Sequence, residues 1–158
     1  MCCHGGRYVV RIGYGVLRGM NYNLSCVVLK DEDKMGFTLE RGGRVLESRA
    51  YRKVSASSKE NSLNVVLKGI SVARGYLTHM DNLVIEVESR YLERCLNGYT
   101  EPKEYLELLD NINTLLDSCD CRYSSVCNKS QRAVHCVRNL TVGKVEGTRA
   151  TDIMRGLE

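Results

Sequence analysis

Short apolar segments alternate along the chain with longer segments that have the periodicity of a helix. Apolar or alternating residues typical of strands occupy residues 23–30, 35–40, 44–51 and 121–127. The Gly42-Gly43 pair between the second and third of these segments predicts a tight hairpin turn. A further strand is expected over residues 7–17, but the pattern assigns it no partner.

Three longer segments place apolar residues on one face of a helix. The first follows a capping-box pattern, Ser57-x-x-Glu60, and its apolar face consists of Leu63, Val66, Leu67, Ile70 and Ala73. The second is expected to begin at Thr100, with Pro102 in its first turn, and its apolar face consists of Tyr105, Leu108, Leu109, Ile112, Leu115 and Leu116. The last covers residues 131–140 and carries Ala133, Cys136, Val137 and Leu140.

Residues 82–98 (NLVIEVESRYLERCLNG) begin as a buried strand and end as a short helix. The change occurs at Glu88-Ser89, and Asn97-Gly98 is typical of the end of a helix. A carboxylate placed where a strand becomes a helix is well situated to bind a hard cation. Glu88 is therefore a candidate metal ligand on position alone.

The order of these elements predicts an α/β protein. Three strands joined by tight turns, then a helix, a strand, helices, a strand and a helix, indicate a mixed sheet of about five strands with helices packed on it. A chain of 158 residues is long enough for one such domain. We expect an N-terminal extension over residues 1–21, the domain over 22–142 and a flexible tail over 143–158.

Composition and charge narrow the classes of function without choosing among them. The chain is 43% hydrophobic and 27% charged, and no apolar run approaches the roughly 20 residues of a membrane span. The N-terminus is too polar for a signal peptide, so we expect an intracellular protein, cytoplasmic or nuclear, with no membrane partner. The net charge of +4 permits nucleic-acid binding, and basic residues cluster at Arg41, Arg44, Arg49, Arg52 and Lys53.

The eight cysteines are expected to be reduced in such a compartment. A structural zinc site is a weak alternative, because two groups of potential ligands lack the twice-repeated Cys-x₂-Cys spacing. These groups are Cys119, Cys121, Cys127, His135 and Cys136, and Cys2, Cys3 and His4. Cysteines on predicted strands and helices are more simply interpreted as small apolar residues.

The order of elements, taken with several short motifs, resembles the ribonuclease H-like fold, in particular the reverse-transcriptase-like ribonuclease H domains common in plants. The resemblance covers roughly residues 22–142. The segment from Met35 through Leu77 resembles the family's hairpin and first helix, including its x-Gly-Leu-x-x-Ala motif at Gly69-Ile70 and Ala73. Residues 82–98 resemble the fourth strand with its Asp-Ser step, and the segment 105–140 resembles the closing elements.

The resemblance implies a site with two Mg²⁺ ions held by four carboxylates, which cleaves RNA in an RNA–DNA hybrid. The first-strand acid corresponds to Asp31 and the fourth-strand acid to Glu88. The first-helix acid corresponds to Ser62 and the last-helix acid to Val134, neither of which supplies a charge. At most two of the four acids remain, so we expect no metal site; Mg²⁺ would be a cofactor only if nuclease activity persists.

The sequence therefore favours a catalytically degenerate ribonuclease H-like domain that binds RNA or an RNA–DNA hybrid without cleaving it. Such binding relies on phosphates and sugar hydroxyls, which basic side chains can contact. Two alternatives stay open. One is a protein-interaction or assembly scaffold on the same fold, and the other is a residual divalent-metal-dependent hybrid ribonuclease.

Overall fold

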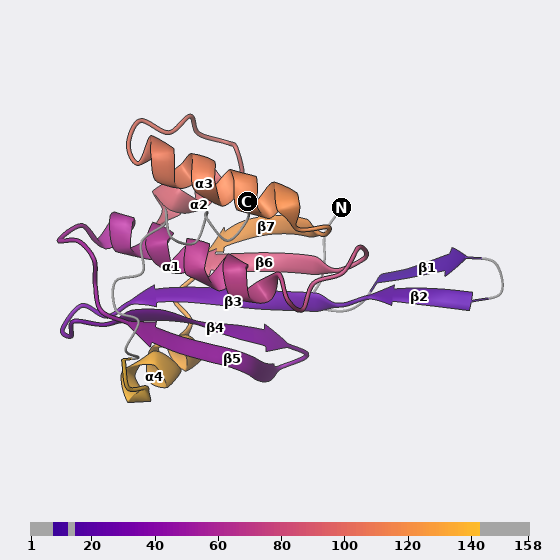
Figure 1. The fold of residues 1–158 in the computed structure, drawn as a ribbon, viewed down its shortest axis with the longest axis horizontal. Coiled ribbons are helices and arrows are strands. Elements are labelled where there is room, and N and C mark those ends of the chain that lie inside the picture. The colour runs from indigo at the N-terminus through magenta and orange to yellow at the C-terminus, as the bar shows by residue number, and fades with distance from the viewer. Residues whose placement is uncertain (1–7, 13–14, 143–158) are drawn as a thin grey trace.

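The computed structural model describes residues 8–12 and 15–142, and they form a five-stranded mixed sheet, a separate hairpin and four helices (Figure 1). The five strands, in spatial order β5-β4-β3-β6-β7, are β3 (Asn21–Val28), β4 (Met35–Arg41), β5 (Arg44–Tyr51), β6 (Asn82–Val87) and β7 (Arg122–Cys127). β3, β4 and β5 are antiparallel neighbours, whereas β6 pairs in parallel with both β3 and β7. The predicted fold class is confirmed.

The helices lie on both faces of this sheet. They are α1 (Ser58–Ala73), α2 (Arg90–Leu96), α3 (Leu106–Ser118) and α4 (Gln131–Asn139). α1 and α3 pack on one face and on each other, while α4 packs on the opposite face against β3, β4 and β5 (Figure 1). Two apolar clusters result, a large one under α1 and α3 and a small one under α4.

Local sequence signals explain much of this arrangement. Gly42 and Gly43 both have positive φ, 60° and 76°, which glycine adopts without strain, and they turn β4 into β5. All five predicted apolar residues of α1 are fully buried. Gly98 follows α2 with φ 77°, as the Asn97-Gly98 pair predicts.

The N-terminal prediction is wrong in one respect, because residues 7–17 do not form a single strand. β1 (Tyr8–Ile12) and β2 (Gly15–Gly19) pair antiparallel, from Tyr8 opposite Gly19 to Ile12 opposite Gly15. Glycines interrupt the apolar alternation here, and glycine is uncommon inside a continuous strand. In Figure 1 this hairpin projects beyond the end of the sheet at which β3 begins. The predicted tail over 143–158 lies outside the described residues.

The start of α3 also differs from the prediction. The helix begins at Leu106 rather than after Thr100, and Tyr105 precedes it in a left-handed conformation with φ 58°. The Thr100 hydroxyl accepts a hydrogen bond from Arg94 Nε at 3.0 Å instead of capping a helix. The Thr100 hydroxyl, which the sequence suggested as a helix cap, is therefore bonded to Arg94 instead.

Only one of the two hydrogen bonds of the α1 capping box forms directly. Ser57 Oγ accepts from the Glu60 backbone N–H at 3.2 Å, as predicted. The Glu60 carboxylate, however, accepts from the Ser55 hydroxyl at 3.1 Å, and that same hydroxyl accepts from the Ser57 N–H at 2.9 Å. The reciprocal bond of the box is thus relayed through Ser55.

In α4 the buried residues are Ala133, Val134 and Val137, so Val134 replaces the predicted Cys136.

Candidate functional site

A pocket of about 360 Å³ opens where the two central parallel strands, β3 and β6, end. The carboxyl ends of parallel strands are the usual place for a ligand site in an α/β sheet. Four parts of the chain build the pocket: the end of β3, the first turn of α1, the β6–α2 junction and the segment after β7. Its lining residues are Val28, Lys30, Ser58, Lys59, Ser62, Glu88, Ser89 and Lys129.

Glu88 is held firmly at the β6–α2 junction. One carboxylate oxygen accepts a hydrogen bond from the Val28 backbone N–H at 3.0 Å. The other lies 3.9 Å from the ammonium of Lys129. The side chain is 24% exposed, so this pair is only partly screened by water. Both carboxylate oxygens therefore already have a partner within the protein.

The pocket is positively charged. Lys30, Lys59 and Lys129 supply three ammonium groups against the single carboxylate of Glu88, a formal balance of 3 − 1 = +2. The Lys59 ammonium lies 4.9 Å from the centre of the Tyr91 ring, a cation–π contact that holds its side chain beside α2. Among the described residues, neither Lys30 nor Lys59 forms an ion pair.

Ser62 contributes a hydroxyl that nothing in the described structure satisfies. The residue is 6% exposed and lines the pocket, yet its Oγ has no hydrogen-bond partner among the described residues. Buried hydroxyls without a partner are uncommon because each loses its bonds to water on folding. The oxygen itself is buried, so a bound group would reach it through a rotation of the Ser62 side chain toward the pocket.

The loop before α3 contacts the N-terminal end of α1, where Ser58 and Lys59 line the pocket. The Tyr105 hydroxyl is 2.7 Å from Ser57 Oγ, the group that caps α1. The Tyr91 hydroxyl, in turn, accepts from the backbone N–H of Lys103 at 3.2 Å. A tyrosine in the left-handed region costs roughly 1–3 kcal/mol, and its hydroxyl contact helps to hold it there.

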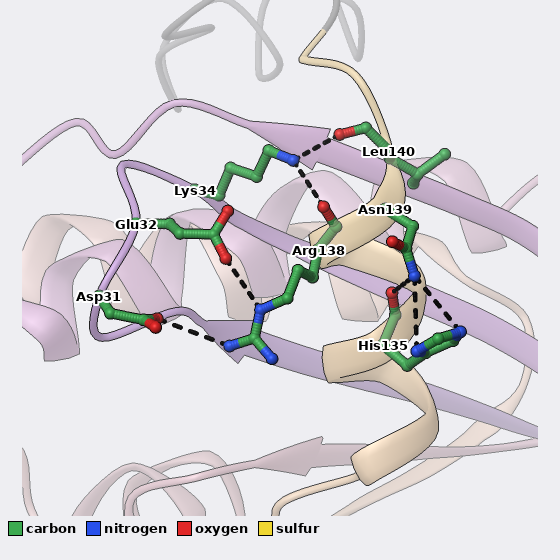
Figure 2. Close-up of polar contacts among 7 residues, drawn as sticks. All are labelled: Asp31, Glu32, Lys34, His135, Arg138, Asn139 and Leu140. Carbon is green, nitrogen blue, oxygen red and sulfur yellow. Dashed lines mark hydrogen bonds and ion pairs between the residues drawn. The ribbon is translucent and has the colours of Figure 1, made fainter.

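Asp31, the predicted first-strand acid, is not among the residues that line the pocket. It lies in the turn between β3 and β4 with its side chain 73% exposed, and Arg138 Nη2 is 3.5 Å from its carboxylate. Figure 2 shows Arg138 reaching this turn from α4, where it also donates to Glu32 at 2.8 Å. Lys34 completes the contact by donating to the carbonyls of Arg138 and Leu140, which end α4 (Figure 2).

Val134, which stands at the position of the last-helix acid, lies in the small apolar cluster under α4, with Val27 and Ala50. The structure therefore brings Glu88 and Ser62 together in one pocket but places Asp31 and Val134 elsewhere. Within residues 8–12 and 15–142, no group of three or more His, Cys, Asp or Glu side chains is arranged to hold a metal ion.

The five predicted nucleic-acid contacts do not form one patch. Arg41 pairs with Tyr22 at the start of β3, whereas the pocket lies at Val28, six residues or about 20 Å further along that strand. Arg41 stacks over the Tyr22 ring at 5.7 Å, and Arg49 is 3.5 Å from Glu47. Arg44 is the cross-strand neighbour of Arg41, and Arg52 and Lys53 follow β5 at the end of the sheet nearer the pocket.

The cysteines considered for zinc are spread over the fold. Cys121 and Cys127 flank opposite ends of β7, about 20 Å apart. His135 is exposed on α4, where its ring and its carbonyl oxygen contact the Asn139 side chain (Figure 2). Burial raises the pKa of the Cys121 thiol to about 12, with a smaller contribution from Cys119. The six described cysteines are all free, and Cys2, Cys3 and His4 lie outside the described residues.

Sequence reasoning missed most of the pocket. The predicted site residues do not include Lys30, Ser58, Lys59, Ser89 and Lys129. One signal was present: Lys30, Glu88 and Lys129 each stand one or two positions after the end of a strand, at the edge where ligands bind. No helix in the described residues is long and apolar enough to cross a membrane.

Comparison with solved structures identifies the fold. The LC11 RNase H1, crystallised with an RNA/DNA hybrid, aligns over 88% of this chain and 99% of its own, with TM-score 0.59 and 10% identity. RNase H1 of Halobacterium salinarum aligns over 77% and 92%, with TM-score 0.57 and 13% identity. The N-terminal RNase H domain of Mycobacterium tuberculosis rv2228c aligns over 89% and 100%, with TM-score 0.56 and 11% identity.

No protein-family model and no curated protein sequence matches the chain. The structural similarity nevertheless shows that the chain has a ribonuclease H-like fold, as the sequence motifs predict. At 10–13% identity among these neighbours, similarity establishes the fold alone. The function has to be argued from the pocket.

Proposed function

We propose that this ribonuclease H-like domain binds nucleic acid, RNA or an RNA–DNA hybrid, and does not cleave it. The observation that carries the proposal is the charge of the pocket at the ends of β3 and β6. Three lysines and one carboxylate face it, where a two-metal nuclease would need several carboxylates. A cationic pocket attracts phosphates and repels divalent cations.

The donor set does not fit a pair of Mg²⁺ ions. Mg²⁺ requires oxygen ligands in near-ideal octahedral geometry, and two ions close together need several negative charges. Among the described residues, Glu88 is the sole carboxylate lining the pocket, and the Val28 N–H and the Lys129 ammonium already engage its oxygens. A cation entering here would compete with an ammonium group for one carboxylate.

Nucleic acid is the ligand class that the charge favours best. The LC11 RNase H1 was crystallised with an RNA/DNA hybrid, so this fold is known to present a surface to such a duplex. Phosphates supply most of the affinity in complexes of this kind, and lysine and arginine neutralise them. The exposed Arg44 and Arg52 and the half-buried Lys53 lie outside the pocket and offer further contacts of that type.

The test is a binding and cleavage assay on one sample. Fluorescently labelled RNA–DNA hybrid is incubated with the protein in Mg²⁺ or Mn²⁺, and denaturing gels report cleavage while anisotropy reports binding. We expect an intact hybrid and binding that weakens steeply as salt rises. Cleavage that Glu88→Gln abolishes would contradict the proposal and favour the residual nuclease. Absence of binding at low salt would contradict it as well and favour a protein scaffold.

A further inference from the structure

We propose that the pocket binds one phosphate group of the nucleic-acid backbone, with lysine ammonium groups and the Ser62 hydroxyl as its partners and no metal ion. The inference rests on the proposed function and makes it more specific. It assigns the contact to named atoms on α1, after β3 and after β7. Three features of the pocket support this assignment: an unsatisfied donor, the end of a helix and an excess of positive charge.

The unsatisfied donor is Ser62. Its side chain is buried, it lines the pocket, and its Oγ has no partner among the described residues. A phosphate oxygen would accept a hydrogen bond from this hydroxyl and remove the desolvation cost that the empty pocket leaves. The hydroxyl therefore favours a ligand that accepts hydrogen bonds over a pair of metal ions, because a neutral oxygen adds no negative charge to balance them.

The helix end is that of α1, which has 16 residues and begins at Ser58. The first backbone N–H groups of a helix have no intrahelical acceptor, and the helix dipole makes this end electropositive. The Ser57 hydroxyl satisfies only the Glu60 N–H of this set. Ser58 and Lys59, in the first turn, line the pocket beside Ser62, which is the arrangement of an anion site.

The excess charge comes from Lys30, Lys59 and Lys129. Tyr91 holds Lys59 by its cation–π contact, and Glu88 holds Lys129 at 3.9 Å. Glu88 is then a positioning residue, since it directs Lys129 and the Val28 N–H and does not itself contact the phosphate. The balance of +2 exceeds the single charge of a phosphodiester, so one backbone phosphate is neutralised with charge remaining for its neighbour.

The experiment combines two ligands and two pairs of variants. Inorganic phosphate is titrated into ¹⁵N-labelled protein, and amide shifts are followed by NMR. The RNA–DNA hybrid is titrated by anisotropy. Ser62→Ala and Lys59→Gln test the pocket. Ser71→Ala, an exposed serine on the same helix, and Lys103→Gln, an exposed lysine outside the pocket, are the matched controls.

We expect phosphate to shift the amides of Ser58, Lys59 and Ser62 before others. Ser62→Ala and Lys59→Gln should each weaken hybrid binding about threefold to tenfold, whereas the controls stay within twofold. In urea unfolding Ser62→Ala should be at least as stable as the wild type, because the lost hydroxyl has no partner in the free protein and alanine favours the helix. That result separates a binding role from a structural one.

The failures can be told apart. If the wild type binds the hybrid and neither pocket variant differs from its control, the phosphate site is wrong and the proposed function stands. If phosphate shifts the pocket amides but the hybrid does not bind, the proposed function and the nucleic-acid assignment both fail. If neither ligand acts on the pocket, both proposals are wrong.

Discussion

Glu88 stands at the end of β6, where the resemblance predicts a metal ligand, but the groups around it suit another task. In a two-metal site a carboxylate balances cation charge together with other carboxylates. Here its neighbours are the Val28 N–H and the Lys129 ammonium, and the other predicted acid position that lines the same pocket is Ser62. One carboxylate with both oxygens engaged stabilises lysine side chains rather than a metal.

A single substitution at Glu88 distinguishes these two tasks. Glu88→Gln keeps an oxygen for the Val28 N–H and removes the negative charge beside Lys129. Loss of a partly exposed ion pair is worth about 0.5–1 kcal/mol, so hybrid binding should tighten about twofold to fivefold as repulsion of phosphate falls. Anisotropy titrations at fixed salt measure this, with Glu107→Gln, an exposed acid on α3, as the control. Weaker binding of Glu88→Gln would show that the orientation of Lys129 by the carboxylate outweighs the repulsion that the substitution removes.

Gly69 is the glycine of the motif on which the resemblance rests, and its packing explains why a small residue is needed there. A Cβ atom there would lie 2.7 Å from Leu24 Cδ1 and 2.8 Å from its Cδ2, and Leu24 is fully buried in β3. We expect Gly69→Ala to destabilise the fold by about 1–3 kcal/mol through overpacking between α1 and the sheet.

Urea unfolding measures this loss. Gly75→Ala is the matched control, because its nearest contact would be Val72 O at 3.5 Å, an ordinary distance. Equal stability of the two variants would mean that α1 can move away from Leu24 at little cost.

Among the elements, α4 depends on the turn between β3 and β4. The Lys34 ammonium donates to the carbonyl oxygens of Arg138 at 2.8 Å and Leu140 at 2.7 Å, where the helix ends (Figure 2). Lys34→Met should remove these bonds and lower stability by about 1 kcal/mol, with faster hydrogen exchange concentrated in α4. Lys103→Met is the control, and an exchange pattern changed throughout the sheet would contradict a local role.

The position of Asp31 in the same turn predicts that its carboxylate takes no part in ligand binding. Its carboxylate faces Arg138 at 3.5 Å and is 73% exposed, away from the residues that line the pocket. Asp31→Asn should therefore leave hybrid affinity unchanged within twofold, in the assay that detects Lys59→Gln. A large loss of binding or of any divalent-dependent cleavage would restore Asp31 as a site residue.

The sequence was sufficient for elements whose signals are local. The Gly42-Gly43 hairpin, the apolar face of α1 and the end of α2 follow from neighbouring residues, and the structure confirms them. The start of α3 was not predictable, because Arg94 takes the Thr100 hydroxyl. Asp31 could not be placed either, since its partner Arg138 is 107 positions away.

The pocket was the least predictable feature for the same reason. Its three lysines stand on separate parts of the chain, after β3, in α1 and after β7, and only the fold brings them together. The resemblance alone predicted residues without a charge, Ser62 and Val134, at two of the four acid positions. The gain of positive charge around Glu88 required the tertiary structure.

The stability of the whole molecule should fall at alkaline pH because of Cys26. Burial, followed by the nearby carboxylates of Glu86 and Glu88, raises the pKa of this thiol far above its ordinary value of 9.0. The folded protein then keeps the proton, while the unfolded chain releases it above about pH 9. Unfolding thus releases a proton, so the free energy of unfolding falls as pH rises.

The expected slope from this one thiol is about 1.4 kcal/mol per pH unit above pH 9.5. Urea unfolding under reducing conditions, from pH 7 to pH 11, measures it as the difference between the wild type and Cys26→Ala, because other groups titrate in both. The variant should start less stable and show the flatter profile. Parallel profiles would mean that Cys26 ionises in the folded protein.

The basic residues are spread over about 20 Å of the sheet, so the length of the ligand should decide which of them contribute. A trinucleotide can occupy the pocket without reaching Arg44, whereas an 18-base-pair hybrid, at about 3.4 Å per pair, spans both. Lys59→Gln should weaken binding of both ligands and reduce the salt slope by about 0.7–0.9. Arg44→Gln should weaken only the hybrid, and Lys103→Gln neither. Anisotropy for the hybrid and NMR for the trinucleotide, each at several salt concentrations, measure these effects. If Arg44→Gln weakened the trinucleotide as much as Lys59→Gln does, the short ligand would bind at the Arg41–Arg44 end of the sheet, and the pocket would not be the primary phosphate contact.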